Sequence, residues 1–509
     1  MLEAALEALS IILDPSRFGW IVLGVAMGLV VGLIPGLNGV TGMSLLLPFV
    51  FGMDPASGIA MLIGLLAVVS TSDTFPAVLI GIPGTAGAQA TIMDGYPLAR
   101  SGQAGRALGA AFISSMLGGV FGAIILFAGI WAARPLILSM RSPDLFILAL
   151  LGLCLVGVLS RGKPVAGILS GAMGLLLGTI GSAPATGAPR FTFGDTYLYG
   201  GIPLAVLAMG LFAIPELTRL MTTDTSVARA GKLQGGLLSG AREALRHKRL
   251  MLRSSALGAG LGIIPGIGGS VVDWITYAVA TKGKENEELG SGNIRGVIAP
   301  ESANNAKDGG GLVPTLLFGI PGSGGGAMML VALTLFGIEA GPSMVGENLP
   351  ITLTIAWTLA IANIIGAAAC FAFAPLAARV SLIPGRKLVP VLLVFMVIAA
   401  YQSSGHIGDV ILFFAIGILG LAMVRAGWPR PPLMIGFVLA GPAERYLHLS
   451  ITRYGWDWLA FPSVIVCTAL IVGVCAYAAV RTRKAPDAAI LGVVGPSDPS
   501  NVAPDSDAR

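Results

Sequence analysis

Long apolar stretches, joined by short polar segments, follow one another along almost the entire chain. A membrane-spanning helix takes about 20 consecutive apolar residues, so this pattern has room for about 10 to 13 spans. Hydrophobic residues make up 55% of the chain and charged residues only 11%, whereas a soluble domain carries roughly 25% charged residues. The sequence therefore predicts an all-α polytopic membrane protein.

Glycine and proline interrupt these apolar stretches often, with 72 glycines and 32 prolines in 509 residues. Within lipid, a helix breaker is tolerated only where other protein or a water-lined cavity satisfies the freed backbone groups. We therefore expect broken helices or re-entrant hairpins at membrane depth.

The two ends of the chain differ from its apolar middle. In residues 1–16, leucines fall on one helical face opposite Glu3 and Glu7, which predicts a helix lying in the membrane interface. This segment lacks the basic start and the cleavage site of a signal peptide. Residues 485–509 are polar and rich in proline, serine and aspartate, so we expect them to be disordered.

The chain contains two copies of one pattern, which is the strongest signal in the sequence. Each copy carries a Pro-Gly break, then a Gly-Ile-Pro-Gly turn, then a proline followed closely by a glutamate. The matching segments are 32–39 with 262–269, 75–84 with 313–322, and 210–216 with 438–444. Because the order is the same, we expect one membrane repeat at 17–216 and another at 254–447.

The basic residues predict opposite orientations for the two copies. Lys and Arg concentrate in cytoplasmic loops, and they are frequent in the connecting segment 217–253 and again directly after the last apolar run, 459–480. This last run is an extra helix outside the repeats, so the second copy is left with an odd number of crossings. We expect an inverted repeat in a bacterial inner membrane, with a periplasmic N-terminus and a cytoplasmic C-terminus.

Inverted repeats with paired broken helices are typical of secondary transporters, whose sites lie where the breaks meet near the middle of the membrane. One block of helices would move against the other, as in an elevator. The alternative is that glycine and proline only let helices pack closely. It accounts for scattered residues such as Gly118 and Gly122, but poorly for four Pro-Gly breaks in matched positions. An anion channel or non-coupled pore is a further alternative.

The two Ile-Pro-Gly turns form the expected substrate site. The half-helix after each turn would aim free N–H groups and its positive dipole end into the cavity, which suits a carboxylate. Thr85, Gln89 and Thr91, together with Ser323, would add neutral donors, although Thr85 and Ser323 could instead only cap their helices. The residues expected to bind substrate are Gly81, Pro83, Gly84, Thr85, Ala86, Gln89, Thr91, Asn304, Asn305, Pro321, Gly322, Ser323, Gly324 and Gly325.

The other two breaks, with their unpaired carbonyl groups, form the expected cation site, and Na⁺ or H⁺ would be the coupling ion. Ionisable residues at membrane depth are costly and therefore functional candidates, among them Asp73 and Glu301. Lys307 beside Asp308 would equally form a local pair, and Asp94 is expected to cap a turn. The cation-site residues are Pro35, Gly36, Asn38, Gly39, Thr41, Asp73, Pro265, Gly266, Gly268, Gly269, Ser270 and Asp273.

Other classes of function receive little support. The net charge of +5 is concentrated in the segment 229–253, so a nucleic-acid partner is not expected. The four cysteines lie in apolar runs without metal-ligand spacing. No Walker motif is present, and an intramembrane hydrolase using Ser323 would lack a base, because the histidines lie elsewhere. We therefore expect neither an enzyme nor a bound cofactor.

The motif-bearing stretches 32–39, 76–102, 262–269 and 299–326 resemble the TctA family, the large membrane subunit of tripartite tricarboxylate transporters. The resemblance extends from about residue 24 to residue 444. It implies two partners, a small TctB-like membrane subunit of about four spans and a periplasmic TctC-like solute-binding protein. It also implies import of di- and tricarboxylates or related organic acids, driven by a Na⁺ or H⁺ gradient.

Overall fold

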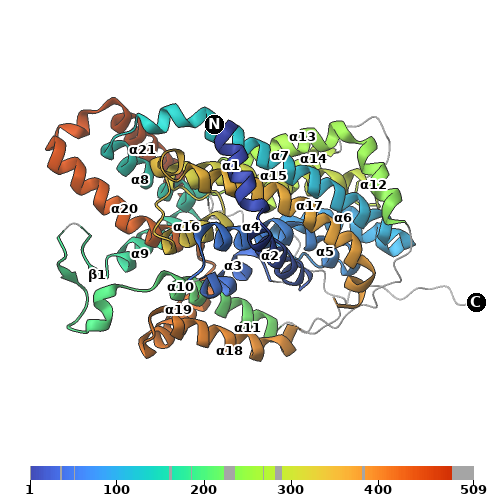
Figure 1. Cartoon of the computed structure of the whole chain (residues 1–509), viewed down its shortest axis with the longest axis horizontal. Helices are drawn as coiled ribbons and strands as arrows, with labels where there is room; N and C mark the ends of the chain where they lie inside the picture. The colour runs from blue at the N-terminus through green and yellow to red at the C-terminus, as the bar shows by residue number, and fades with distance from the viewer. Residues whose placement is uncertain are drawn as a thin grey trace, which may run out of the picture.

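The computed structural model describes residues 2–34, 37–50, 52–159, 163–184, 186–222, 236–267, 269–280, 289–380 and 385–483. Nearly all of them are helical (Figure 1). Within these ranges the strands are short, and β1 (Gly181–Ser182) pairs antiparallel with β2 (Pro189–Arg190). The prediction of an all-α membrane protein is therefore confirmed.

The first half of the chain contains helices, short 3₁₀ turns and two π turns (η3 and η5). They are α1 (Leu2–Leu13), α2 (Pro15–Leu33), α3 (Gly39–Leu46), η1 (Leu47–Val50), α4 (Pro55–Ser72), α5 (Thr74–Ile80), η2 (Ala86–Ala88), α6 (Gln89–Leu98), η3 (Ala99–Gln103), α7 (Ala104–Leu138), α8 (Ser142–Leu159), α9 (Pro164–Gly178), η4 (Thr196–Gly200), α10 (Leu204–Ala208), η5 (Met209–Ala213) and α11 (Ile214–Thr222).

The second half follows a similar order and ends with a helix that has no counterpart in the first. Its elements are α12 (Leu237–Arg246), α13 (Lys248–Gly262), α14 (Gly269–Ala280), α15 (Arg295–Phe318), α16 (Gly324–Leu335), η6 (Pro342–Val345), α17 (Leu349–Val380), α18 (Gly385–Ser404), α19 (Ile407–Arg425), α20 (Pro431–Tyr454), η7 (Asp457–Ala460) and α21 (Pro462–Arg483).

Several of these helical stretches are long and apolar enough to cross a membrane. Among the described residues there are 5 of them, with shorter apolar helices such as α3, α8, α9 and α16 beside them. The chain is therefore a multi-pass membrane protein. The long stretches are Pro15–Leu33, Pro55–Ile80, Ala86–Leu138, Leu349–Leu376 and Ile407–Arg425.

Sequence signals explain where two central helices begin. Asp14 precedes Pro15 at the start of α2, and its side chain accepts a hydrogen bond from the Ser16 amide. Asp54 precedes Pro55 at the start of α4 and accepts from the Ser57 amide at 3.2 Å. Proline suits the first helical position because its fixed φ is already helical and its missing N–H is not needed there.

Glycines set the close packing of the central helices in both halves. A Cβ at Gly28 of α2 would lie 2.6 Å from the Leu65 carbonyl oxygen of α4. Likewise, a Cβ at Gly258 of α13 would lie 2.4 Å from the Ala303 carbonyl oxygen of α15. Small residues let backbones approach in this way within membranes, so part of the high glycine content serves packing.

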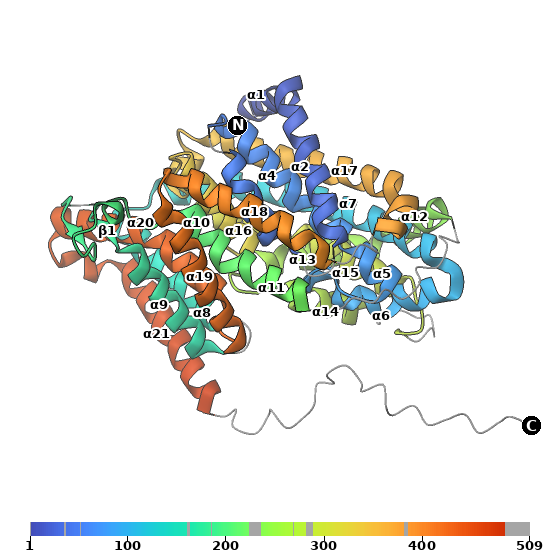
Figure 2. The same cartoon turned by 90° about the horizontal axis from the view of Figure 1, so that it is seen from below.

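The helix contacts repeat when the two halves are exchanged. The pair α2–α4 corresponds to α13–α15, and α4–α17 corresponds to α15–α7. At the edges, α1 packs on α17 as α12 packs on α7. Figures 1 and 2 show α2, α4, α7, α15 and α17 together in the middle of the molecule. The duplication read from the sequence thus extends to the packing, while the inverted orientation in the membrane stays a prediction.

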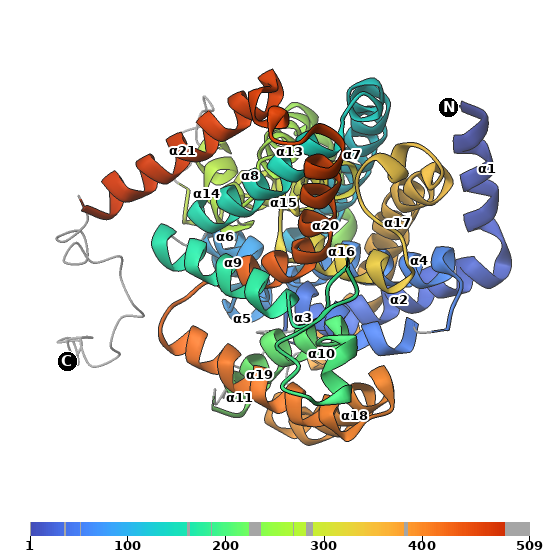
Figure 3. The ribbon, with the colours of Figure 1, turned by 90° about the vertical axis from the view of Figure 1, so that its left-hand side faces the viewer.

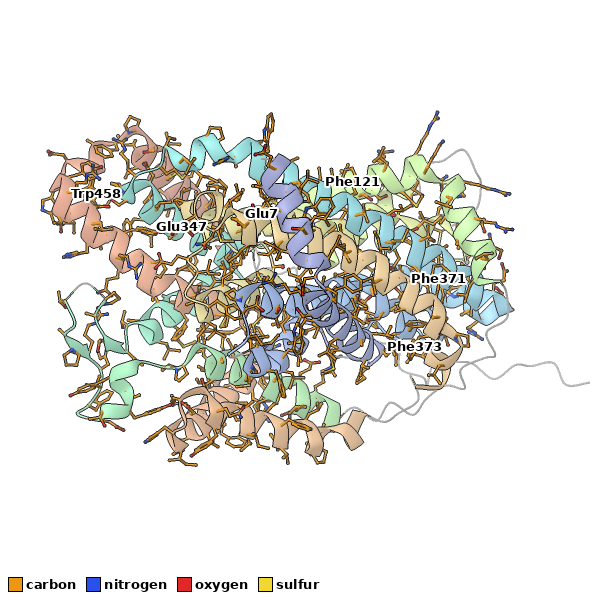
Figure 4. All side chains as sticks on the ribbon, in the orientation of Figure 1. Glu7, Phe121, Glu347, Phe371, Phe373 and Trp458 are labelled. Atoms are coloured by element: carbon orange, nitrogen blue, oxygen red, sulfur yellow. The ribbon has the colours of Figure 1, made fainter. Side chains whose placement is uncertain are left out.

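Two groups of helices flank this central bundle. One contains α8, α9, α20 and α21, and the other contains α10, α11, α18 and α19; Figure 3 shows α21 on the opposite side of the molecule from α1. The first group has a small core of its own, in which Trp458 lies edge-on to Phe146 at 5.7 Å (Figure 4 labels Trp458). On α17, Phe371 packs on Phe112 inside the bundle, whereas Phe373, also labelled there, is exposed.

Candidate functional site

The two Ile-Pro-Gly turns break the chain in the same way. Gly81 after α5 and Gly319 after α15 both have φ of +69°, in the left-handed region that glycine adopts without strain. Each glycine caps its helix by donating to a proline carbonyl one turn earlier, Pro76 and Pro314 respectively. We call α5, the turn 81–85, η2 and α6 the first hairpin, and the end of α15, the turn 319–323 and α16 the second hairpin.

A hydroxyl residue caps the half-helix that leaves each turn. Thr85 accepts a hydrogen bond from the Gly87 amide at 3.1 Å, and Ser323 accepts one from the Gly326 amide at 3.2 Å. The capping role that the sequence left open is therefore present at both positions.

The two Pro-Gly breaks also precede helices. Asn38 caps α3 by accepting from the Thr41 amide at 3.0 Å, and Gly266, with φ of +85°, lies in the turn before α14. The expected cation-site residues Pro35, Gly36 and Gly268 lie outside the described residues, as does the side chain of Ser270.

Each hairpin lies beside the Pro-Gly break of the other half. A Cβ at Gly269, at the start of α14, would lie 3.5 Å from Gly87 Cα in the first hairpin. A Cβ at Gly324, at the start of α16, would lie 2.7 Å from the Val40 side chain of α3. The duplicated fold thereby places four helix starts, two from each half, in two crossed pairs.

The two halves meet where residues at equivalent positions contact each other. Ser70 donates to Asp308 at 2.9 Å, and these positions are 238 residues apart. Asn305 donates to the Ala67 carbonyl oxygen at 3.5 Å over the same separation of 238. The two Gly-Ile-Pro-Gly turns share that separation, so the crossing of α4 and α15 marks the axis that relates the halves.

Asp73 lies directly behind the first turn and is fully buried. Thr85 donates its hydroxyl hydrogen to Asp73 Oδ2, and a Cβ at Gly84 would lie 2.6 Å from Asp73 Cβ. The other oxygen, Oδ1, is buried and makes no hydrogen bond with any described residue. A carboxylate oxygen in this state is costly unless a cation or a proton satisfies it.

Asp273 of α14 approaches the same hairpin from the other half. It is fully buried, and its Oδ2 accepts the Ala90 amide at 2.6 Å. Its Oδ1, like that of Asp73, has no hydrogen-bond partner among the described residues. Two buried carboxylates, one from each half, thus hold the first hairpin and each keeps one oxygen available.

Glu301 of α15 serves a different role, because both of its oxygens are satisfied. It accepts from Thr74 at 2.9 Å, from Thr91 at 2.8 Å and from Ser115 at 2.8 Å. These hydroxyls come from α5, α6 and α7. Glu301 therefore joins both arms of the first hairpin to the central bundle.

Lys307 and Asp308 form a local pair close by, with Nζ 3.1 Å from Oδ1. Asp308 uses its other oxygen for Ser70, and a Cβ at Gly269 would lie 3.5 Å from Lys307 Nζ. Lys307 and Asp308 thus form the local, self-neutralising pair that the sequence offered as an alternative. Asp73, Asp273 and Glu301 are left as an excess of acidic groups around the first hairpin.

The second hairpin has apolar surroundings. A Cβ at Gly325 would lie 2.8 Å from the Leu66 side chain. At the equivalent place in the first hairpin, a Cβ at Gly87 would lie 2.2 Å from Asn304 Oδ1. Beside the bend at Gly319, a mainly apolar cavity of about 270 Å³ lies between α8, α16 and α20, with Arg445 and Glu339 in its wall.

Comparisons with known proteins agree with this architecture. A model of the tripartite tricarboxylate transporter TctA family matches residues 18–435. The chain belongs to the TctA family. It is 31% identical over 460 residues, 90% of this chain and 92% of the relative, to an "Uncharacterized 52.8 kDa protein in TAR-I ttuC' 3'region" of Agrobacterium vitis. A second Agrobacterium vitis protein, "Uncharacterized protein in TAR-II ttuC' 3'region", is 30% identical over 215 residues, 42% of this chain and 89% of that protein.

No solved structure matches the chain. Membership of the TctA family confirms the resemblance seen in the motifs and makes this chain the transporter subunit of a tripartite tricarboxylate transporter. The roles of single residues in this TctA-family chain rest on the geometry alone.

The expected substrate residues divide into two groups. Thr85, Thr91 and Asn305 already use their side chains inside the protein; Asn305, for instance, donates to Thr71 and to Asn363 at 2.8 Å each. Gln89 and Ser323 are partly accessible. The binding of substrate by any of them stays a prediction.

The structure corrects one expectation and adds residues that the sequence did not reveal. Asp94 does bind a turn of the chain, but this turn belongs to the other half: Asp94 accepts from the Gly290, Gly292 and Asn293 amides at 2.8 to 2.9 Å. The hydroxyl partners of Glu301, such as Thr74 and Ser115, were not expected, because no local motif marks a contact between distant segments.

Proposed function

We propose that this chain is the substrate-translocating subunit of a cation-coupled, binding-protein-dependent importer of di- or tricarboxylates or related organic acids. A small TctB-like membrane subunit and a periplasmic TctC-like binding protein would complete the system in a bacterial inner membrane. Na⁺ or H⁺ would be the coupling ion. The observation that carries this proposal is the pair of buried carboxylates at the first hairpin, Asp73 and Asp273, each with one oxygen lacking a partner among the described residues.

The coupling cation binds at the first hairpin, where both halves supply oxygen ligands for it. These ligands are Asp73 Oδ1, Asp273 Oδ1 and the side-chain oxygen of Asn304. Hard oxygen ligands of this kind suit Na⁺, and a single carboxylate oxygen suits a proton equally. Among the described residues, no group of three His, Cys, Asp or Glu side chains could hold a metal ion. A Na⁺ ion would therefore also need hydroxyl, amide or carbonyl oxygens.

Electrostatics supplies the link between cation and substrate. When the buried acids of the first hairpin are ionised, their negative charge repels an approaching carboxylate. Two like charges about 8 Å apart repel by about 2 kcal/mol at an effective dielectric constant of about 20. Bound cations remove this repulsion, so the organic acid binds between the two hairpins only after the cation. The N–H groups at the start of α16 then face the acid without a nearby buried carboxylate.

The test is uptake of labelled citrate and related acids into vesicles that contain the complete three-part system. Na⁺ and H⁺ gradients are imposed separately, with and without the binding protein. We expect saturable uptake that requires one gradient and the binding protein. Uptake that does not depend on either gradient, or ion conductance through the isolated subunit, would favour the channel alternative and refute coupling.

A further inference from the structure

A basic cavity lies at the elbow between α12 and α13, next to the start of α15 and outside both hairpins. It has a volume of about 480 Å³. Its polar wall is formed by Arg246, His247, Lys248, Arg249, Arg253 and Arg295. No carboxylate from the described residues lines it, so no acid among those residues balances the positive charge of its wall.

The nearest described acid on these helices has another partner. Glu243, one turn before Arg246, binds Arg106 of α7 through both oxygens at 2.6 Å. Hydrogen bonds from Arg106 hold the pKa of Glu243 below its usual range, so this carboxylate is committed to α7. The Arg295 guanidinium is positioned by the Ala280 carbonyl oxygen at 3.2 to 3.3 Å, which fixes one wall of the cavity.

Apolar side chains continue the site toward the surrounding lipid. Leu250 and Val279 line the cavity, while Leu245 of α12 and Leu252 of α13, on the two helices that form the elbow, are 52% and 59% exposed. The opposite face of α12 is closed: a Cβ at Gly240 would lie 1.9 Å from the Arg106 carbonyl oxygen on α7. Most of the basic side chains and both exposed leucines therefore belong to the same pair of helices, α12 and α13.

The first half shows that such a basic elbow is not required by the fold. There α1 takes the place of α12, packing on α17, with the Trp357 indole donating to the Ala5 carbonyl oxygen at 2.8 Å. Its charged residues are Glu3 and Glu7 (Glu7 is labelled on α1 in Figure 4). The basic cluster is thus specific to the α12–α13 elbow.

We propose that this elbow binds the phosphate-bearing headgroup of an anionic phospholipid, with the acyl chains lying along Leu245 and Leu252. Basic pockets beside membrane helices recognise such headgroups through charge-assisted hydrogen bonds from arginine. None of the residues that line the cavity belongs to either hairpin.

The experiment titrates phosphatidylglycerol and phosphatidylcholine onto the purified full-length chain and counts bound lipids by native mass spectrometry. We expect selective retention of phosphatidylglycerol. The double variant Arg249→Gln/Arg253→Gln removes two cations, each contributing about 1 kcal/mol near an anionic surface, so retention weakens about tenfold or more. The control is Arg242→Gln, an exposed cation on α12 outside the cavity, which leaves retention unchanged. Arg249→Lys/Arg253→Lys keeps the charge and retains most of the binding.

Four results would overturn the assignment. The first is equal retention of both lipids, and the second is unchanged retention in the glutamine variant with its fold intact by thermal unfolding. The third concerns free phosphate: if inorganic phosphate displaced the lipid completely, the site would be an anion site rather than a lipid site. The glutamates Glu285, Glu287 and Glu288 lie outside the described residues, so a triple glutamine variant is included. A large rise in lipid binding there would assign the cavity to that segment instead.

Discussion

The two hairpins share one backbone but differ in the chemistry around them. Both turn at a left-handed glycine, and both are capped by a hydroxyl residue. The first has buried carboxylates and an asparagine against it. At the second, Leu66 takes the place of the asparagine and Gly311 stands at the position equivalent to Asp73. The duplicated halves thus kept the scaffold, and their side chains diverged. This difference supports the proposal that the cation binds at the first hairpin and that the second hairpin receives the acid.

The largest expected effect comes from Asp73→Asn. The variant keeps the shape of the side chain but removes the charge that the cation requires. Hydrogen bonds and contacts to a charged group contribute about 1.5 to 3 kcal/mol, so gradient-driven uptake should fall roughly 10- to 100-fold. The control is Asp54→Asn, since asparagine also caps a helix well. Normal coupled uptake by Asp73→Asn would show that the Asp73 carboxylate does not bind the cation.

A pair of alanine substitutions compares the two hairpins directly. In Gly87→Ala the new methyl group would meet Asn304 Oδ1 at 2.2 Å, and in Gly325→Ala it would meet the tip of the Leu66 side chain at 2.8 Å. Overpacking costs typically about 1 to 3 kcal/mol, and a flexible leucine can move aside. We expect Gly87→Ala to lower uptake about tenfold and Gly325→Ala to lower it less than twofold. Equal losses would contradict the asymmetry.

Exchanging the residues that face the hairpins sharpens the comparison further. Asn304→Leu gives the first hairpin the apolar neighbour of the second, and Leu66→Asn does the reverse. We expect Asn304→Leu to raise the cation concentration needed for half-maximal uptake several-fold. The variant loses one oxygen ligand, which contributes about 1 kcal/mol to cation binding. Leu66→Asn should leave that concentration unchanged. If this concentration changed only in Leu66→Asn, the cation would bind at the second hairpin and the proposal would be refuted.

Modest, few-fold effects are expected at the two capping residues. Loss of a helix cap costs about 1 kcal/mol, so Ser323→Ala should reduce uptake only a few-fold, without loss of folded protein. Thr85→Val also removes the donor to Asp73, so it should lower apparent cation affinity in addition, while Thr85→Ser should behave as wild type. Unchanged uptake kinetics in both Thr85→Val and Ser323→Ala would show that these hydroxyl groups do not contribute to the site.

Much of the fold could be predicted because its signals are local or repeated. Apolar runs gave the membrane helices, and the matched Pro-Gly motifs located all four chain breaks. The partners of the buried acids could not be predicted in this way. Glu301 binds Thr91 across 210 residues of sequence, and Asp94 caps a turn near residue 290. Such contacts depend on how the two halves dock, which no local pattern encodes.

The contact between Ser70 and Asp308 has a consequence for how motion in this protein can be measured. If the halves are the predicted inverted repeat and exchange conformations during transport, the Ser70–Asp308 pair is carried onto itself, so the distance between these two residues is the same at both ends of the cycle. Spectroscopic labels on α4 and α15 near this crossing would therefore give a constant signal. With this constant distance as a reference, a change in the distance between labels on other helices can be interpreted as movement of those helices.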